Sequence, residues 1–317
     1  MKEKIVIGVD IGGTNTGFGF VDKKGKCICD DSIPTHAEQS AEQLFERLFD
    51  KINSLINLYR NNYEIVGIGI GAPNANYHKG TVENPPNLKW GIVNVNKIVT
   101  KYFSVPCVIT NDANAAALGE MLFGTARGMK NFVVITLGTG LGSGIVVEGK
   151  LVYGADGFAG EFGHTIVDPD GRVCGCGNKG CLETYASATG IKRTVFELIC
   201  NTATESKLRS ISFEDLTAKR IADAAKQGDK LALEAFDFTV KILGMKLSDY
   251  VATLSPEAIV LTGGLAQAES LLLVPTKNYM EKYLPAMFKN KVQIISSSLS
   301  NGQSPILGAA ALIWNEL

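Results

Sequence analysis

The spacing of apolar and polar residues predicts three short strands at the start of the chain. Residues 4–10 are mostly apolar, the pair Gly12-Gly13 follows, and residues 16–21 alternate small and large side chains. A second turn at residues 22–25 leads into a further short strand. Because strands joined by tight turns form antiparallel meanders, we expect a three-stranded antiparallel sheet here.

Helical and strand patterns alternate through the rest of the chain. Residues 131–149 repeat the order of apolar strand, glycine turn and apolar strand, which indicates an internal duplication of one supersecondary unit. Helices are expected over residues 38–60, 93–103, 114–123, 184–200, 214–227, 229–253, 275–289 and 302–317, and strands over 65–71, 105–110, 257–262 and 292–296.

This order of elements predicts an α/β protein of two domains that face each other across a cleft. The smaller domain is expected to comprise residues 1–115 and 302–317, and the larger one residues 116–301. The first glycine turn and part of a ligand pocket fall in the smaller domain. The larger domain carries the second and third glycine turns and a cysteine-rich loop.

Composition and charge exclude several classes of protein. The 317 residues are 45% hydrophobic and 20% charged, and 31 Lys+Arg against 32 Asp+Glu leave a net charge of −1. Such a chain offers no basic field for nucleic acid or anionic lipid. No apolar run reaches the roughly 18 residues of a membrane span. The first residues enter a strand pattern directly, so we expect no signal peptide and a cytoplasmic protein.

The first glycine turn, Asp10-Ile-Gly-Gly-Thr-Asn15, lies between two strands, whereas a dinucleotide-binding fingerprint needs a strand and a helix. Gly12 and Gly13 would let backbone N–H groups approach a phosphate. Thr14 and Asn15 would add side-chain donors, and Asp10 would hold Mg²⁺ through water. An ordinary hairpin turn is the alternative interpretation.

Two further glycine turns strengthen the prediction of a nucleotide site. Residues 137–144 contain four glycines, although each costs roughly 0.5–1 kcal/mol of folding entropy relative to alanine. Gly138, Thr139 and Gly140 would therefore contact a phosphate chain together with the first turn. The pair Gly263-Gly264 would bring backbone against adenosine, although a plain strand-to-helix turn accounts for it equally well.

A metal site is predicted where cysteines crowd together. Cys174, Cys176 and Cys181 fall within eight residues and follow His164. One imidazole and three thiolates complete the closed tetrahedral coordination of structural Zn²⁺. Reduced cysteines in a glycine-rich loop are the alternative.

Carboxylates are candidates for the chemistry. Asn111 and Asp112 follow an apolar strand and open a helix, a favoured ligand position in α/β sheets. Helix capping is the alternative for this pair, and Asn114 is expected to be a pure cap. Glu161 and Glu183 lie so close to the metal ligands in sequence that the metal would hold them in place, whereas isolated glutamates would be solvated surface charges.

These residues resemble the ROK family of sugar kinases (repressors, open reading frames, kinases). Together with Gly263-Gly264, the matching motifs occur in family order over nearly the whole chain: Asp10-Ile-Gly-Gly-Thr14, Gly69-Ile-Gly-Ala-Pro73, Pro86-Asn-Leu88, Asn111-Asp-Ala-Asn-Ala-Ala-Ala-Leu-Gly-Glu120, Leu137-Gly-Thr-Gly-Leu-Gly142, Ala159-Gly-Glu-Phe-Gly-His164 and Cys174-Gly-Cys-Gly-Asn-Lys-Gly-Cys-Leu-Glu183.

The resemblance implies the actin-like ATPase (ribonuclease H-like) fold, a homo-oligomer (dimer or dimer of dimers), and transfer of the γ-phosphate of Mg-ATP to a hexose 6-hydroxyl. Asp112 would be the general base, and the glycine turns would be the phosphate loops. The resemblance also implies a set of sugar contacts, in which His164 binds zinc as well: Asn74, Asn87, Asn111, Asp112, Glu161, His164 and Glu183.

Two positions depart from the family pattern. Asn15 stands where many relatives carry lysine, so its phosphate contact would be neutral. Residues 82–90 lack the commoner Pro-Gly-Trp ending, which leaves the choice of sugar open. Glucose is the expected hexose, with N-acetylmannosamine, N-acetylglucosamine, fructose or allose as alternatives. A sugar-responsive transcriptional repressor is a more remote alternative, because no basic recognition helix is visible near the N-terminus. A non-catalytic sugar sensor is the third.

Overall fold

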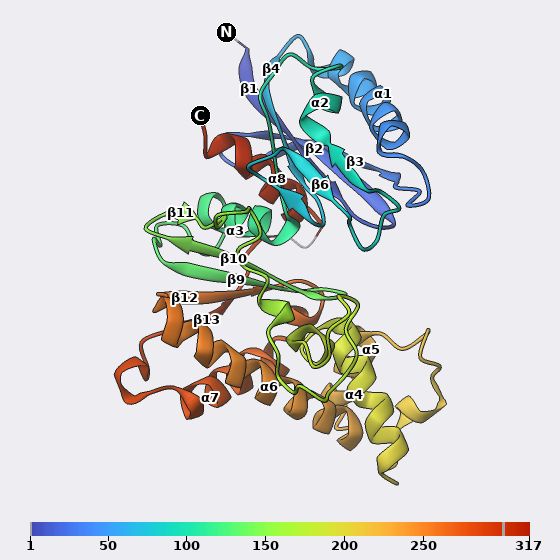
Figure 1. Cartoon of the computed structure of the whole chain (residues 1–317), viewed down its shortest axis with the longest axis vertical. Helices are drawn as coiled ribbons and strands as arrows, with labels where there is room; N and C mark the ends of the chain where they lie inside the picture. Colours follow the sequence, from blue (N-terminus) through green and yellow to red (C-terminus); the bar gives the residue numbers. More distant parts are fainter. Residues whose placement is uncertain (1, 300–301) are drawn as a thin grey trace. The chain divides into compact units, whose positions relative to one another are not determined.

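In the computed structural model, which describes residues 2–299 and 302–317, the chain divides into two units of nearly equal length (Figure 1). The first comprises Met1–Gly128, Lys150–Ala159 and Ser298–Leu317, and the second comprises Met129–Gly149 and Gly160–Ser297. The first boundary follows Gly128 and not residue 115, because the helix after residue 111 packs on elements of the first unit. Residues 300 and 301, expected in the second domain, lie outside the described residues.

The first unit is built on a five-stranded sheet of order β3-β2-β1-β4-β8. Strands β1, β2 and β3 are antiparallel neighbours, which confirms the predicted meander, whereas β1–β4 and β4–β8 are parallel. The strands are β1 Glu3–Ile11, β2 Asn15–Asp22, β3 Cys27–Pro34, β4 Tyr63–Gly71 and β8 Cys107–Thr110. A small separate sheet contains β5 Ala75–Asn76, β6 Thr81–Glu83 and β7 Ile92–Asn94. Strand β11, Lys150–Leu151, belongs to neither of these sheets and is the edge strand of the other five-stranded sheet.

Helix α1, Ala41–Tyr59, begins at Ser40 with a reciprocal capping box to Gln43, and its apolar stripe of Leu44, Leu48 and Ile52 is fully buried. The helix expected over residues 93–103 is shorter than predicted. Its first residues belong to strand β7, and Asn94 caps α2, Val95–Val99. The remaining helices of this unit are α3 Asp112–Leu122 and α8 Ser304–Trp314.

The C-terminal helix α8 packs on glycines of the first sheet. A Cβ on Gly8 of β1 would lie 2.2 Å from the carbonyl oxygen of Ile306, and one on Gly69 of β4 would lie 1.9 Å from that of Ala309. Only glycine permits so close an approach of helix and strand backbones. This packing places the expected C-terminal helix in the first unit.

The second unit repeats the strand arrangement of the first. Strand β9, Phe132–Leu137, pairs antiparallel with β10, Leu141–Val147, and parallel with β12, Ala258–Thr262, which pairs parallel with β13, Gln293–Ser296. In the first unit β1 likewise pairs antiparallel with β2 and parallel with β4, and β4 pairs parallel with β8. The duplication predicted from the sequence is therefore confirmed in the topology.

Helices α4, α6 and α7 cover one face of the second sheet (Figure 1). Helix α6 is the longest and is packed against both α4 and α7. The helices are α4 Ala188–Asn201, α5 Ala218–Lys226, α6 Lys230–Leu254 and α7 Leu273–Tyr283, with short 3-10 helices at Phe162–His164, Leu182–Thr184, Lys207–Ser210, Leu265–Leu271 and Ala286–Phe288. Within residues 2–299 and 302–317, no helix combines the length and apolar character that a membrane crossing requires.

Candidate active site

The first unit gathers two carboxylates at one edge of its sheet. Asp10, near the end of β1, is the register partner of Gly71 at the end of β4, and Gly71 is the partner of Thr110 at the end of β8. Asp112 follows two residues later, in the first turn of α3. Because these parallel strands end together, residues far apart in sequence meet at the carboxyl edge.

Gly71 leaves room beside the carboxylate of Asp10 and the backbone of Asp112. A Cβ there would lie 3.7 Å from Oδ1 of Asp10 and 3.8 Å from the Cα of Asp112. Burial, and secondarily the charge of Asp112, raises the pKa of Asp10 to about 7. Like charges in a poorly hydrated place disfavour ionisation, and a bound cation would relieve both effects.

Asp112 is accessible to solvent, yet the surrounding protein limits the hydration of its carboxylate. This desolvation raises the pKa of Asp112, although a hydrogen bond of 2.9 Å from the amide of Ala113 to Oδ1 acts in the opposite direction. A carboxylate with a raised pKa accepts a proton more readily than an ordinary aspartate. The geometry therefore suits a general base.

Asn111 is the N-cap of α3, because its Oδ1 accepts a 2.8 Å hydrogen bond from the amide of Asn114. The prediction that Asn114 is the pure cap is therefore wrong. Asn114 lies three residues further along the helix and is buried. Its Nδ2 donates a 3.2 Å hydrogen bond to Oγ1 of Thr110. The capping bond occupies Oδ1 of Asn111 and fixes the orientation of its amide.

The first glycine turn is a tight hairpin that two hydrogen bonds from Thr35 stabilise. The hydroxyl of Thr35 donates to the carbonyl of Gly12 at 2.8 Å, and its amide donates to the carbonyl of Thr14 at 2.8 Å. Thr14 and Asn15 are exposed at the tip. A Cβ on Gly13 would lie 3.0 Å from the Cβ of Asn87, so the segment of Asn87 lies directly beside this turn.

Asn74 organises its own loop. It has a φ of 51°, and its Nδ2 donates to the carbonyls of Glu83 at 3.2 Å and Asn84 at 3.1 Å. These bonds tie the end of β4 to the loop before Asn87. The residue is exposed, and its amide nitrogen makes both of these hydrogen bonds.

In the second unit, two glycine turns meet at the carboxyl edge of the sheet. Gly138, Thr139 and Gly140 join β9 to β10, and Gly263 follows β12 with a φ of 93°. A Cβ on Gly263 would lie 2.7 Å from the carbonyl oxygen of Leu137, so the two turns are in backbone contact. Cβ atoms on Gly138 or on Gly264, the next residue, would meet open space.

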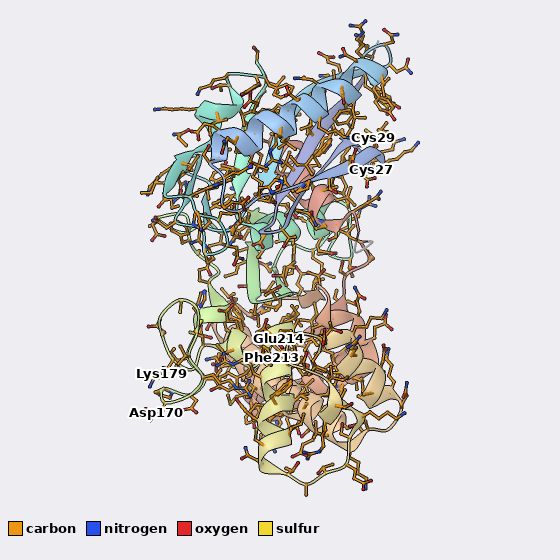
Figure 2. All side chains as sticks on the ribbon, turned by 90° about the vertical axis from the view of Figure 1, so that its right-hand side faces the viewer. Cys27, Cys29, Asp170, Lys179, Phe213 and Glu214 are labelled. Carbon is orange, nitrogen blue, oxygen red and sulfur yellow. The ribbon has the colours of Figure 1, made fainter. Side chains whose placement is uncertain are left out.

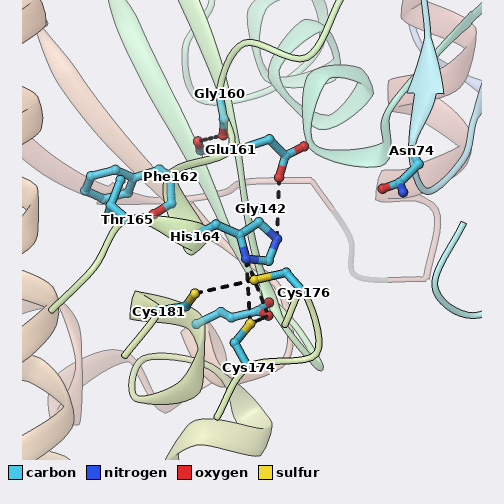
Figure 3. Close-up of polar contacts among 12 residues, drawn as sticks. Asn74, Gly142, Gly160, Glu161, Phe162, His164, Thr165, Cys174, Cys176 and Cys181 are labelled. Atoms are coloured by element: carbon cyan, nitrogen blue, oxygen red, sulfur yellow. Dashed lines mark hydrogen bonds and ion pairs between the residues drawn. The ribbon is translucent and has the colours of Figure 1, made fainter. Parts of the chain in front are cut away.

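His164, Cys174, Cys176 and Cys181 form a four-ligand cluster, as the sequence predicts. Their candidate ligand atoms all lie within 4.8 Å of one another, with 3.7 Å between Nδ1 of His164 and Sγ of Cys174 and 3.6 Å between the sulfurs of Cys176 and Cys181 (Figure 3). Zn–S bonds of about 2.3 Å in a tetrahedron place sulfurs about 3.8 Å apart. The donor set and its spacing therefore fit Zn²⁺.

The loop that carries these cysteines, residues 168–181, is called the metal loop below. It is closed by its own backbone bonds, from the amide of Gly180 to the carbonyl of Arg172 at 2.7 Å and from the amide of Cys174 to that of Asn178 at 2.9 Å. Asp168 and Gly180 approach so closely that a Cβ on Gly180 would lie 1.6 Å from the carbonyl oxygen of Asp168. The backbone contacts of the loop therefore define its shape.

Each ring nitrogen of His164 faces one of the two acidic candidates of this unit, and Figure 3 shows Glu161 beside the ring. Nε2 of His164 is 3.8 Å from Oε2 of Glu161, and Nδ1 is 3.8 Å from Oε1 of Glu183. Nδ1 faces the sulfurs, so metal ligation there would leave the proton on Nε2. His164 would then present a hydrogen-bond donor next to the carboxylate of Glu161.

Glu161 is held through its neighbour Gly160. The hydroxyl of Ser143 on β10 donates to the carbonyl of Gly160 and lies 2.7 Å from the hydroxyl of Tyr250 on α6. The ring of Tyr250 also packs on Phe162, with 3.5 Å between ring centroids. Strand β10 and helix α6 therefore hold the segment that carries Glu161 and His164.

Several supporting residues were missed by the sequence reasoning. Gly71 stands inside the quoted motif Gly69-Ile-Gly-Ala-Pro73, and its place at a strand end next to Asp10 was the available signal. Thr35 and Tyr250 act through partners far away in sequence. No local pattern announces such contacts, because they arise only from packing.

Known proteins resemble this chain over nearly its full length. A model of the ROK family matches residues 6–316. The glucokinase of Halalkalibacterium halodurans is 34% identical, over 97% of this chain and 94% of that protein. The crystal structure of a ROK family glucokinase from Streptomyces griseus in complex with glucose and AMPPNP matches with a TM-score of 0.82 and 33% identity, covering 97% of this chain and 98% of the other.

The same fold also serves regulators. A ROK family transcriptional regulator, a homologue of the E. coli MLC protein, matches with a TM-score of 0.89 and 27% identity, covering 99% of this chain and 78% of the regulator. Likeness of fold alone therefore does not separate kinases from regulators, and the site residues must do so.

Proposed function

The chain belongs to the ROK family, whose members have the actin-like ATPase fold, and on that premise we propose that it is a glucokinase. It transfers the γ-phosphate of Mg-ATP to the 6-hydroxyl of glucose. The observation that carries this proposal is the placement of Asp112, with its raised pKa, beside Asp10 at the carboxyl edge of the first sheet. Two glucokinases are among its relatives at 33–34% identity over nearly the full chain.

Asp112 acts as the general base in this proposal. It accepts the proton of the 6-hydroxyl as the oxygen attacks the γ-phosphorus in line with the departing ADP. Its place in the first turn of α3 and the bond from Ala113 fix the direction of the carboxylate. Because phosphoryl transfer depends mainly on positioning, this fixed direction contributes directly to the rate.

Each unit contributes proposed contacts for Mg-ATP from its own glycine turns. Asp10 fits a water-mediated contact to Mg²⁺, because burial and the charge of Asp112 disfavour its ionised form and a nearby cation would favour it. When bound, Mg²⁺ neutralises charge on the transferred phosphoryl group. The proposed nucleotide contacts are Asp10, Gly12, Gly13, Thr14 and Asn15 from the first unit and Gly138, Thr139, Gly140, Gly263 and Gly264 from the second.

The sugar hydroxyls are assigned to polar groups of each unit. In the second unit, the Nε2 donor of His164 and the acceptors of Glu161 and Glu183 provide both hydrogen-bonding polarities. A sugar needs such fixed partners because every buried unpaired hydroxyl is penalised. The first unit adds Asp112 and, by proposal, Asn111, Asn74 and Asn87.

The four-ligand cluster is assigned to structural Zn²⁺. His164, Cys174, Cys176 and Cys181 fill a tetrahedron, so no ligand position remains for an activated water. The ion would hold the orientation of His164 and the position of Glu183. Three zinc thiolates suit a reducing compartment, which supports our proposal of a cytoplasmic protein.

We also propose a homo-oligomer, a dimer or a dimer of dimers, that has no nucleic-acid partner. The net charge of −1 gives the chain no general attraction to nucleic acid. Sedimentation at micromolar concentration tests the first point. Filter binding across a salt titration tests the second, since genuine DNA binding weakens steeply as salt rises.

The sugar-kinase proposal is tested by ADP release with Mg-ATP across glucose, mannose, fructose, N-acetylglucosamine and N-acetylmannosamine. We expect the highest kcat/KM with glucose and a loss of about 10²–10⁴-fold in kcat for Asp112→Asn. Asparagine preserves the acceptor for the Ala113 amide, so the variant should fold normally. Asp223→Asn, on the exposed face of α5, is the matched control and should leave the rate unchanged.

The other outcomes separate the alternatives. Activity confined to an acetamido sugar or fructose would retain the mechanism and change the substrate. Full activity of Asp112→Asn would refute Asp112 as the base. Absence of turnover with every sugar, from folded zinc-loaded protein that still binds glucose, would favour a sugar sensor or regulator over a kinase.

A further inference from the structure

Arg172 is a buried arginine inside the metal loop that the proposed chemistry does not use. Only 8% of the residue is exposed. Nε donates to Oε1 of Glu197 at 2.8 Å and one terminal nitrogen donates to Oε2, which makes a bidentate pair. The remaining bonds go to the carbonyl of Thr184 at 2.7 Å, the carbonyl of Gly190 at 3.2 Å and Oγ1 of Thr194 at 3.0 Å.

These five bonds match the five N–H donors of a guanidinium, so the side chain is fully satisfied. The fit is specific for arginine. A lysine has three donors and no planar fork, and it cannot reproduce the bidentate contact. The guanidinium carbon also lies 4.5 Å from the centroid of the Tyr185 ring, and the hydroxyl of Tyr185 accepts a 3.1 Å bond from the Arg172 amide.

The contacts of Arg172 join three separate segments of the second unit. Its backbone belongs to the metal loop, where its carbonyl accepts from Gly180. One bond reaches Thr184, the residue directly after Glu183, and the others reach α4. A metal held by the four candidate ligands would join the loop to His164, so the Arg172 contacts are an attachment of the loop to a different element.

We propose that Arg172 is a positioning residue that fastens the metal loop and Glu183 to α4 independently of the metal. Arg193 supports the same attachment, because its side chain on α4 donates to the carbonyl of Val173 at 2.9 Å. The loop keeps its place when the metal leaves, and Glu183 stays near His164. Retention of the metal in turn depends on a loop whose three cysteines stay close to His164, the fourth ligand.

The exposed tip of the metal loop provides a direct test that requires no kinase activity. Asp170 and Lys179 lie at the outer edge of the second unit, on the loop that projects from its ribbon (Figure 2). Trypsin cleaves after Lys179 only when the local backbone opens, so cleavage reports the open population. The experiment compares cleavage at Lys179, by mass spectrometry, in wild type and Arg172→Met, each stripped of zinc with a chelator.

We expect stripped Arg172→Met to be cut at Lys179 about tenfold faster than stripped wild type. Arg220→Met, an exposed arginine on α5, is the matched control and should be cut at the wild-type rate. Equal cleavage of stripped wild type and Arg172→Met would overturn the proposal. It would mean that the metal alone holds the loop.

A second readout follows the zinc-loaded proteins. We expect a chromogenic chelator to withdraw zinc about tenfold faster from Arg172→Met than from wild type, and Arg172→Lys to fall between them. If circular dichroism shows that Arg172→Met is unfolded, Glu197→Gln and Thr194→Val, which each remove one acceptor atom of the Arg172 guanidinium, replace it. Unchanged zinc release in these folded variants would also contradict the proposal.

The third readout rests on the proposed function. Loosening Glu183 should raise the KM for glucose about tenfold while the KM for ATP stays within about twofold. A general loss of structure would change both constants. If no sugar is phosphorylated even by wild type, the proposed function fails, whereas the cleavage and zinc-release measurements still decide the role of Arg172.

Discussion

The carboxylate of Glu183 touches the sulfur of Cys174, with 2.9 Å between Oε1 and Sγ. Its other oxygen reaches the glycine turn between β9 and β10, where a Cβ on Gly140 would lie 2.5 Å from Oε2. One side chain thus contacts both the metal cluster and a proposed phosphate turn. Because Glu183 is also a proposed sugar ligand, the state of the metal should affect substrate binding.

Removal of the metal should therefore weaken glucose binding as well as stability. Structural zinc contributes directly to folding free energy, so we expect the melting temperature to fall by about 5 °C or more. The KM for glucose should rise more than the KM for ATP. Calorimetry and steady-state kinetics before and after chelation, and after readdition of Zn²⁺, measure both effects.

Two cysteine variants provide the control for metal removal. Cys176→Ser removes a ligand and should reproduce the chelated protein even in excess Zn²⁺. Cys200→Ser, at an exposed position of α4 outside the cluster, should behave as wild type. A chelated protein with unchanged stability and kinetics would show that the four ligands do not hold a structural ion.

The raised pKa of Asp112 predicts a displaced acid limb of the pH profile. Catalysis needs the ionised carboxylate, so kcat/KM for the sugar should fall as pH decreases through the pKa. Desolvation places this midpoint above the usual aspartate value of about 3.9. Rates measured at saturating Mg-ATP and limiting glucose between pH 4 and pH 9 would locate it, and an ordinary midpoint would contradict the desolvation argument.

Asp10 should reduce the stability of the metal-free protein at neutral pH. Burial and the charge of Asp112 raise its pKa from 3.8 to about 7, so the folded state binds the proton more tightly than the unfolded state. The contribution of Asp10 to the free energy of unfolding therefore falls as pH rises from about 4 to about 7. In EDTA at pH 7.5, Asp10→Asn should raise the free energy of unfolding by roughly 1–2 kcal/mol, since partial exposure screens the full effect.

The pH dependence of the Asp10→Asn effect separates electrostatics from packing. Below about pH 4 both states carry a protonated Asp10, so the gain should vanish. Urea denaturation at three pH values measures it. A destabilised variant at pH 7.5 in EDTA would mean that the Asp10 carboxylate makes a favourable contact and not a repulsive one.

Much of the fold follows from the sequence because its signals are local. The meander around Gly12-Gly13, its repetition at residues 131–149 and the amphipathic stripe of α1 each lie within one short window. The helix expected over residues 93–103 was overextended, because β7 pairs with β6 and takes the first residues. The first boundary lies beyond residue 115, because α3 packs on α8 from the other end of the chain.

Some residues of the candidate site can likewise be predicted from local sequence, and others cannot. The four metal ligands and the glycine turns are visible in the sequence, since ligation and tight turns require particular residues at short spacing. The choice of Asn114 over Asn111 as the cap failed, because both residues suit the position and only the strand end decides. The roles of Gly71 and Arg172 depend on contacts between distant segments, which no local pattern encodes.

Two glycines of β4 give a matched test of how the carboxylate edge is built. A Cβ on Gly69 would lie 1.9 Å from the carbonyl oxygen of Ala309, so Gly69→Ala must push α8 off the sheet. We expect it to destabilise the protein by about 3 kcal/mol or more, or to prevent folding. A Cβ on Gly71 meets nothing closer than 3.4 Å, so Gly71→Ala should fold with nearly normal stability.

The added methyl of Gly71→Ala would nevertheless stand between Asp10 and Asp112. It would displace water or Mg²⁺ from the space beside the Asp10 carboxylate, so we expect kcat to fall at least about tenfold and the Mg²⁺ requirement to rise. Chemical denaturation and rates across a Mg²⁺ titration distinguish the two variants. Normal activity of Gly71→Ala would mean that this space is not part of the catalytic site.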